Sequence, residues 1–163
     1  DDRIMPHMGG RELAERLKED LRAEPLLLGP GEEQPRAEWV IARSRVLVRS
    51  LVGRDSPELL PAVLARCHAL VSADSGPAHL AAAVGTPVVT LFGPTDPRKT
   101  RPLGARQTAL WAGVPCSPCF LPRCPMRGAS RSAISRSAAR TSGWIRYARR
   151  TAGQTACRDP RPG

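Results

Sequence analysis

Apolar residues along this chain form short continuous runs that alternate with segments of helical spacing. Continuous runs of this length, bounded by Gly and Pro, predict buried strands. We expect such strands in PLLLG (25–29), RVLVRSLVG (45–53), ALVSA (69–73), PVVTLFG (87–93) and QTALWAG (107–113). Apolar positions three or four residues apart, or helix-start signals such as Ser56-Pro57, predict helices over 10–23, 32–42 (starting near Pro35), 56–67 and 77–84.

The order of these elements predicts an α/β fold. Strands that alternate with helices through short connections are typical of a Rossmann-like parallel sheet with helices on both faces. The run VVTLF (88–92) supports this interpretation, because parallel strands are buried on both sides and form continuous apolar stretches. Ligands of such sheets bind beyond the carboxyl ends of the strands, so we expect the chemistry of the domain, residues 1–126, at that edge.

Charge is distributed unevenly along the 163 residues. Nine Arg and one Asp in residues 127–163 contribute +8 of the net charge of +10, so residues 1–126 are nearly neutral. The Arg/Ser-rich composition of 127–163 predicts a disordered basic tail, with an RNA-binding arm or an out-of-frame stretch as sharper alternatives. Regular interleaving of basic and aromatic residues is missing, which favours the out-of-frame origin and predicts no specific nucleic-acid binding.

Five cysteines without a secretory context indicate a reducing, cytoplasmic location, and no run of 18 apolar residues predicts a membrane span. Cys116, Cys119 and Cys124 have a spacing that is compatible with thiolate ligation of zinc. Structural zinc normally has four ligands, and a fourth is not evident here, so we expect no metal. No cofactor is expected either.

The turn Asp74-Ser75-Gly76-Pro77 follows one predicted strand and begins a predicted helix. Ser75 or Gly76 is suited to cap this helix, Pro77 suits its first position, and His79 falls in its first turn. The backbone N–H groups of a helix start bind phosphate. An ordinary capped helix explains the same residues, and the turn taken alone favours that simpler explanation.

A second turn, Gly93 to Thr100, follows the next strand and supplies hydroxyl groups and the cations Arg98 and Lys99. Cations after a turn are commonly only solvated, but opposite a helix start they would complete a pyrophosphate pocket. The P-loop motif and the dinucleotide motif Gly-x-Gly-x-x-Gly are absent, which counts against those two kinds of site. We expect the two turns to face the same ligand.

The stretch DSGPAHLAAAVGTPVVTLFGPTDP (74–97) closely resembles the signature of bacterial ADP-heptose:lipopolysaccharide heptosyltransferases, glycosyltransferase family 9. Weaker similarity extends upstream through LLLGPGEE (26–33) to DDRIMP (1–6), and so covers about residues 1–125. The resemblance implies the C-terminal, donor-binding half of a GT-B glycosyltransferase.

The resemblance also implies which residues contact the donor, an ADP-heptose-like nucleotide sugar. The Asp74 turn and the helix after it would meet the donor's phosphates or sugar. Glu32 or Glu33 would hold the adenosine ribose, and Arg3 would approach the phosphates. The full set of expected donor-binding residues is Arg3, Glu32, Glu33, Asp74, Ser75, Gly76, Pro77, His79, Leu80, Gly93, Thr95, Asp96 and Lys99.

The reaction that the resemblance implies is inverting transfer of heptose to a sugar hydroxyl of the lipopolysaccharide core, with a carboxylate as general base. That base belongs to the N-terminal domain in this family, so we expect these 163 residues to bind the donor without turnover. The implied location is the cytoplasm, at the inner face of the inner membrane, with at most peripheral membrane association.

Two other hypotheses stay open. A basic non-enzymatic protein would bind nucleic acid through residues 127–163, and its binding would depend strongly on salt. A GT-B domain of different donor specificity would bind another sugar nucleotide at the same edge of the sheet.

Overall fold

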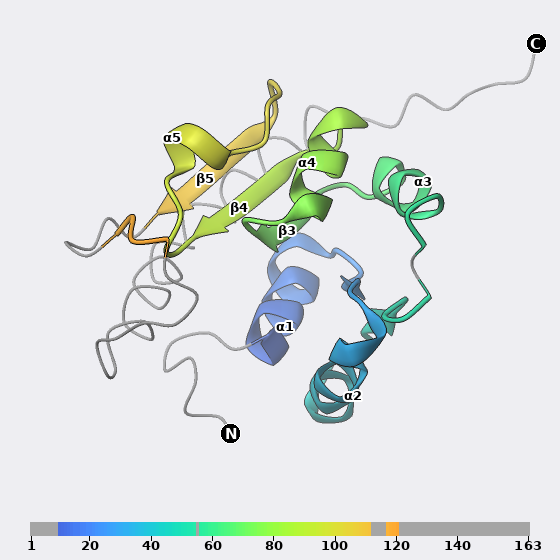
Figure 1. The fold of residues 1–163 in the computed structure, drawn as a ribbon. Helices are drawn as coiled ribbons and strands as arrows, with labels where there is room; N and C mark the ends of the chain where they lie inside the picture. The colour runs from blue at the N-terminus through green and yellow to red at the C-terminus, as the bar shows by residue number, and fades with distance from the viewer. Residues whose placement is uncertain (1–9, 55, 112–116, 121–163) are drawn as a thin grey trace, which may run out of the picture.

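Figure 1 shows the chain as a computed structural model, which describes residues 10–54, 56–111 and 117–120. The elements follow the predicted alternation of helix and strand. In chain order they are α1 (Gly10–Leu21), β1 (Leu26–Leu27), the 3₁₀ helix η2 (Gly31–Glu33), α2 (Gln34–Arg43), β2 (Arg49–Ser50), α3 (Leu60–Ala65), β3 (Leu70–Ala73), α4 (Gly76–Ala83), β4 (Val88–Phe92), α5 (Pro97–Thr100) and β5 (Gln107–Trp111). Across these described ranges, every helix is too short or too polar to span a bilayer.

The strands form two parallel groups. β1 pairs with β2, while β3, β4 and β5 form a second sheet in that order. Every pairing is parallel, so the prediction of a parallel α/β fold is confirmed. The single continuous sheet that the prediction implied is divided in the described part of the chain, because no strand pairing joins β1 to β3.

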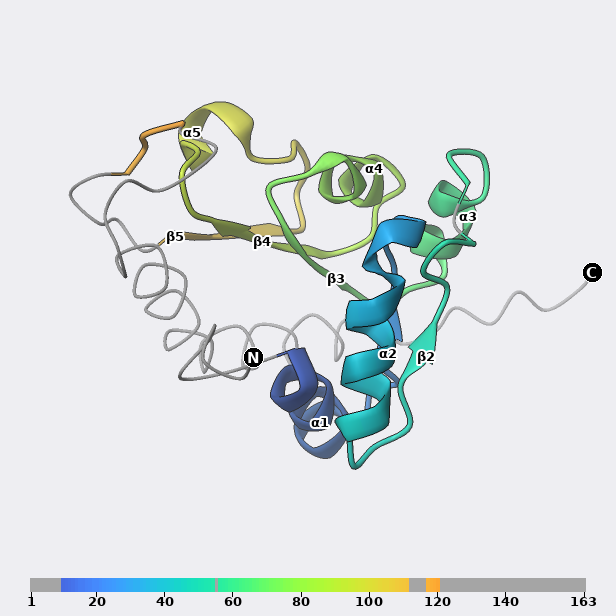
Figure 2. The same cartoon turned by 60° about the horizontal axis from the view of Figure 1, so that its bottom comes forward.

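Helices cover both faces of the three-stranded sheet, as predicted. On one face Val88 packs with Leu64 of α3 and with Ala78 and Ala81 of α4. The neighbouring Val89 points to the opposite face, where leucines of α1 pack against it. Figure 2 shows the result, with α4 and α5 on one side of the sheet and α1 on the other.

The strand predicted over residues 45–53 is reduced to β2, although Leu51 and Gly53 still donate backbone hydrogen bonds to Leu27 and Gly29. Its late start is explained by α1. Glu15 of α1 is only 3% exposed. Its carboxylate accepts hydrogen bonds from the backbone N–H of Arg45 at 3.0 Å and from the guanidinium at 3.2 Å. These bonds hold the start of the apolar run against α1 and out of the sheet, and Leu47 within it is 69% exposed.

The predicted helix boundaries match the structure except near α3 and α5. Ser56 Oγ accepts the N–H of Leu59 at 3.3 Å, as a cap would, but it closes a turn and α3 begins only at Leu60. α5 was expected as part of a turn and is a short helix capped by Asp96. α4 ends before Gly85 as predicted, and the φ of +82° at Gly85 is a conformation that glycine adopts without strain.

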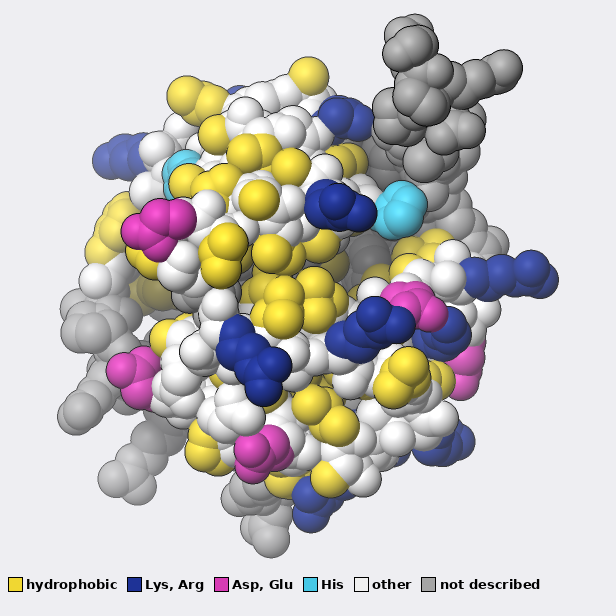
Figure 3. All heavy atoms as spheres, turned by 90° about the vertical axis from the view of Figure 1, so that its right-hand side faces the viewer, with side chains coloured by type: hydrophobic (Ala, Val, Ile, Leu, Met, Phe, Trp, Pro, Cys, Tyr) yellow, Lys and Arg dark blue, Asp and Glu magenta, His cyan; other side chains and the backbone are white. Residues whose placement is uncertain are grey.

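Leu64 offers a direct test of this core. It is fully buried, whereas Leu59 near the start of the same helix is 58% exposed. Figure 3, which faces the α3 side of the molecule, shows that apolar side chains reach the surface there. We expect Leu64→Ala to lower the free energy of unfolding by about 2–5 kcal/mol, because it leaves a cavity. Leu59→Ala is the matched control and should change it by less than about 0.5 kcal/mol. Urea unfolding measures both, and equal effects would contradict the described core.

Glu15 makes the stability of the fold depend on pH. Hydrogen bonds from the backbone N–H and side chain of Arg45 lower the pKa of Glu15 below its ordinary value of 4.5. A carboxylate with a lowered folded-state pKa stabilises the fold above that ordinary value, and this contribution is lost as the pH falls through the folded-state pKa. Glu15→Gln should therefore reduce the thermal midpoint at pH 7 by a few degrees, and the deficit should shrink below about pH 4.5.

The matched control for this test is Glu19→Gln, on an exposed position of the same helix, because Glu19 acts on Arg45 through its charge alone, without a hydrogen bond. Thermal unfolding followed by circular dichroism at several pH values gives the comparison. If the thermal midpoint of Glu15→Gln stays below that of the native sequence by the same amount from neutral to acid pH, the charge of Glu15 is not what holds the chain near Arg45 against α1.

Candidate functional site

The candidate site lies where β3 and β4 end. The two strands run in parallel, with Ala73 opposite Leu91 near their carboxyl ends, so the turns that follow them leave the sheet at the same edge. Thr100 at the end of α5 joins the two turns directly, since its Oγ1 donates to Oδ2 of Asp74 at 2.8 Å. The structure therefore brings the two turns together, and their binding of one ligand stays a prediction.

The first turn differs from the prediction in how its serine is used. Ser75 occupies the N-cap position of α4 with extended backbone (φ −159°, ψ 164°), but its side chain makes no capping bond. The Ser75 hydroxyl instead donates to the carbonyl oxygen of Ala73 at 3.1 Å. Two observations account for this: Pro77, the second helical residue, has no N–H for a cap to accept, and the N–H of Ala78, the third, donates to the carbonyl oxygen of Ser75.

Gly76 carries the backbone donor that this turn offers to a ligand. The Ala78 N–H already donates to the carbonyl oxygen of Ser75 at 3.1 Å, and Pro77 has no N–H. At both Gly76 and Gly93, a β-carbon would meet no non-neighbouring atom of the described residues within 4 Å, so these residues leave room for a ligand beside the backbone at each turn. His79 and Leu80 follow on the exposed side of α4.

The second turn is organised by Asp96. Its carboxylate, in a residue that is 2% exposed, accepts the backbone N–H of Arg98 at 3.0 Å and the Arg98 guanidinium at 2.8 Å. These side-chain and backbone hydrogen bonds lower the pKa of Asp96. Asp96 is thus engaged in holding α5, whereas the adjacent Lys99 is exposed and forms no ion pair within 4 Å in the described ranges.

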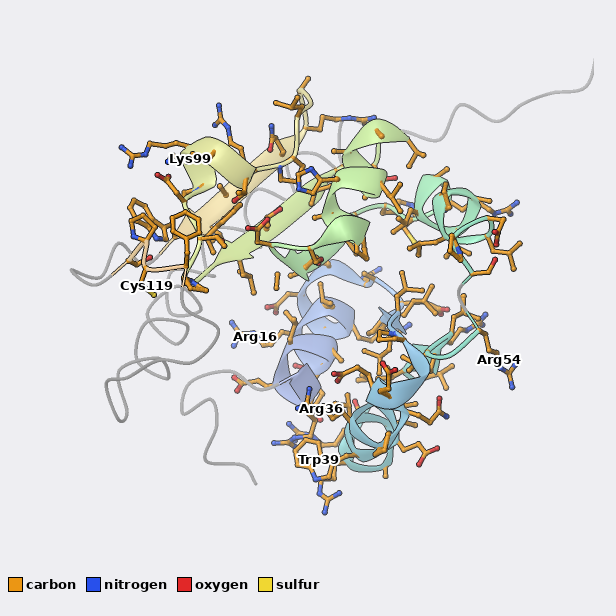
Figure 4. The ribbon with its side chains drawn as sticks, in the orientation of Figure 1. Arg16, Arg36, Trp39, Arg54, Lys99 and Cys119 are labelled. Atoms are coloured by element: carbon orange, nitrogen blue, oxygen red, sulfur yellow. The ribbon has the colours of Figure 1, made fainter. Side chains whose placement is uncertain are left out.

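Residues 117–120 pack on the second turn, and sequence reasoning missed this contact. The Cys119 N–H donates to the carbonyl oxygen of Pro94 at 2.9 Å, and Ser117 Oγ donates to that of Gly93 at 2.6 Å. Figure 4 shows Cys119 and Lys99 on the same side of the molecule. The sequence offered one indication of this contact: the segment follows β5, and the carboxyl end of β5 lies at the same edge of the sheet as that of β4.

Thr95 belongs to the same second turn and precedes Asp96. Its hydroxyl oxygen is buried and has no hydrogen-bond partner among the described residues. The side chain therefore belongs to the interior of the turn in this conformation, and its expected contact with a donor stays a prediction.

The candidate glutamates lie beyond β1, in η2. Glu33 accepts two hydrogen bonds of 2.9 Å from Arg36, while Glu32 is exposed and has no hydrogen bond or ion pair to the other described residues. The turn is packed closely, since a β-carbon on Gly53 would stand 3.2 Å from the Cα atom of Gly31. Glu32 is therefore the freer of the two carboxylates.

Several expected features lie outside the described residues. These are Arg3, the basic segment 127–163, and Cys116 and Cys124 of the cysteine cluster. In the part of the chain that the structure describes, no group of three His, Cys, Asp or Glu side chains is placed to hold a metal ion. The roles expected of the residues outside it stay predictions.

Solved structures with the same fold belong to glycosyltransferases. The chain superimposes on a family 9 glycosyl transferase of Veillonella parvula with a TM-score of 0.65 and 19% identity, covering 84% of this chain and 40% of that one. The TM-score is 0.61, at 28% identity, for the Escherichia coli heptosyltransferase WaaC with ADP, covering 85% of this chain and 38% of that one. The fold is thus that of one part of these GT-B glycosyltransferases.

Curated relatives agree with the structural likeness. Lipopolysaccharide heptosyltransferase 1 of Pseudomonas aeruginosa is 39% identical over 123 residues, which are 73% of this chain and 33% of that protein. Lipooligosaccharide heptosyltransferase 2 of Haemophilus influenzae is 33% identical over 109 residues, 64% of this chain and 31% of that protein. The chain therefore spans about a third of the length of these relatives. Residues 3–130 match the family model for glycosyltransferase family 9 (heptosyltransferase), and the chain belongs to that family.

Proposed function

We propose that this chain holds the nucleotide-sugar donor site of a lipopolysaccharide heptosyltransferase, and that the donor is ADP-heptose or a close relative of it. The observation that carries the proposal is the junction of two ligand-accessible turns at the carboxyl edge of β3 and β4, joined by the bond between Thr100 and Asp74. Support for the nucleotide comes from the similar Escherichia coli heptosyltransferase, whose structure contains ADP.

The diphosphate of the donor fits the start of α4. The positive end of the helix dipole and the Gly76 N–H both attract anions there. The open space beside Gly76 and Gly93 lets a phosphate approach the backbone. Lys99 on α5 is exposed and supplies an ammonium group for the same anion.

Asp74 has a different role from these groups. A carboxylate repels a diphosphate but accepts hydrogen bonds from hydroxyl groups. Only its Oδ2 is hydrogen bonded by a described residue, and that donor is the neutral Thr100. We assign Asp74 to hydroxyl groups of the donor sugar. Glu32 has the same chemistry and is assigned to the ribose hydroxyls.

The reaction proposed for the whole protein is inverting transfer of heptose to a hydroxyl of the lipopolysaccharide core, at the cytoplasmic face of the inner membrane. The relatives that carry this activity are about three times as long as the matched region. For these 163 residues alone we propose donor binding without transfer, with the general base and the acceptor site supplied from beyond the described residues.

Isothermal titration calorimetry with ADP tests the proposal. We expect saturable binding, and we expect Lys99→Ala to weaken it by about tenfold, since one lost charge-assisted contact to phosphate removes roughly 1.4 kcal/mol. Lys18→Ala is the matched control, because Lys18 lies on α1, on the opposite face of the sheet, and should leave ADP affinity unchanged.

Comparison of ADP with ADP-heptose separates the sugar contacts from the phosphate contacts. Asp74→Ala should reduce the affinity for ADP-heptose more than the affinity for ADP, since only the former carries the sugar. Absence of ADP binding, or equal losses for Lys99→Ala and Lys18→Ala, would refute the proposed donor site.

A further inference from the structure

Thr100 occupies the junction between the two turns. It is the last residue of α5, and its hydroxyl reaches back to the end of β3, where it lies 2.8 Å from Oδ2 of Asp74. The same hydroxyl also lies 3.2 Å from the carbonyl oxygen of Asp96, within its own helix. A hydroxyl has one proton to donate, so these two acceptors compete for it.

The geometry favours Asp74 as the acceptor. The carbonyl oxygen of Asp96 already accepts the backbone N–H groups of Lys99 at 2.9 Å and Thr100 at 3.0 Å, which satisfy both of its lone pairs. The carboxylate is charged and closer, and hydrogen bonds to a charged acceptor are the stronger kind. The Thr100 proton therefore belongs to Asp74.

α5 is a firm support for this bond. Asp96 is 2% exposed and binds Arg98 through both carboxylate oxygens, and Pro97 beside it is buried. Within the described part of the chain, no cation lies within 4 Å of the Asp74 carboxylate. The Thr100 hydroxyl is thus the group that restrains the Asp74 side chain there.

We propose that Thr100 is a positioning residue that fixes the orientation of the Asp74 carboxylate and couples the α5 turn to the start of α4. One oxygen of Asp74 is held by Thr100 and the other is directed to ligand hydroxyls. The ligand role of Asp74 rests on the proposed donor site, whereas the coupling between the turns does not depend on it.

Hydrogen exchange of the backbone amides in residues 72–79 tests the coupling without any ligand. Thr100→Val keeps the shape of the side chain and removes the donor, so these amides should exchange about three- to tenfold faster. Thr100→Ser keeps the hydroxyl and should restore the rate of the native sequence. In an Asp74→Ala background, Thr100→Val should have no further effect, because the acceptor is already gone.

The outcomes separate the two roles of Thr100. A loss of protection that persists in the Asp74→Ala background would show that Thr100 acts only within α5 and would overturn the proposal. Unchanged exchange in Thr100→Val would overturn it as well. Faster exchange that requires Asp74 and is restored by Thr100→Ser would establish the coupling.

Titration with ADP-heptose then measures the effect on ligand binding. Thr100→Val should weaken binding by about three- to tenfold through loss of preorganisation, and Thr100→Ser should bind as the native sequence does. If the native chain binds neither ADP nor ADP-heptose, the proposed donor site fails, while the exchange data still decide whether Thr100 positions Asp74.

Discussion

The parallel pairing of β3 with β4 is the constraint on which the candidate site depends. Its register places Ala73 opposite Leu91, so Asp74 and Gly93 leave the sheet at one edge. The same pairing sends Val88 into the core under α3 and α4 and sends Val89 toward α1. A shift of the β3–β4 register by one residue would exchange these two faces. The packing of the helices and the junction of the turns therefore both depend on this register.

Two aspartates near this edge have different surroundings. Asp96 is buried and its carboxylate is engaged by the backbone and side chain of Arg98, so its charge holds α5 in place. Asp74 accepts a hydrogen bond from the neutral hydroxyl of Thr100, and in the described part of the chain its other oxygen accepts none. The proposed donor site would use both, since a ligand-binding group is effective only when the element that orients it is itself held in place.

The edge is also supported by the chain that follows β5. Residues 117–120 follow β5 and bind the carbonyl groups of Gly93 and Pro94, so the second turn is held between α5 and this segment. The chain belongs to glycosyltransferase family 9. The donor binding that we propose would use this arrangement, because a binding site needs a preformed backbone and a few oriented polar side chains.

The sequence by itself determined the α/β class, the positions of β3, β4 and β5, and the two turns beyond them, because continuous apolar runs and their Gly/Pro boundaries are local signals. It also showed the family likeness of residues 74–97. Tertiary structure alone decided that β2 starts late in its apolar run, since Glu15 binds Arg45 across 30 positions, and that Thr100 meets Asp74 across 26. Such bonds form only after the fold brings residues that are far apart in the sequence into contact, and a local pattern of residues does not show which residues will meet.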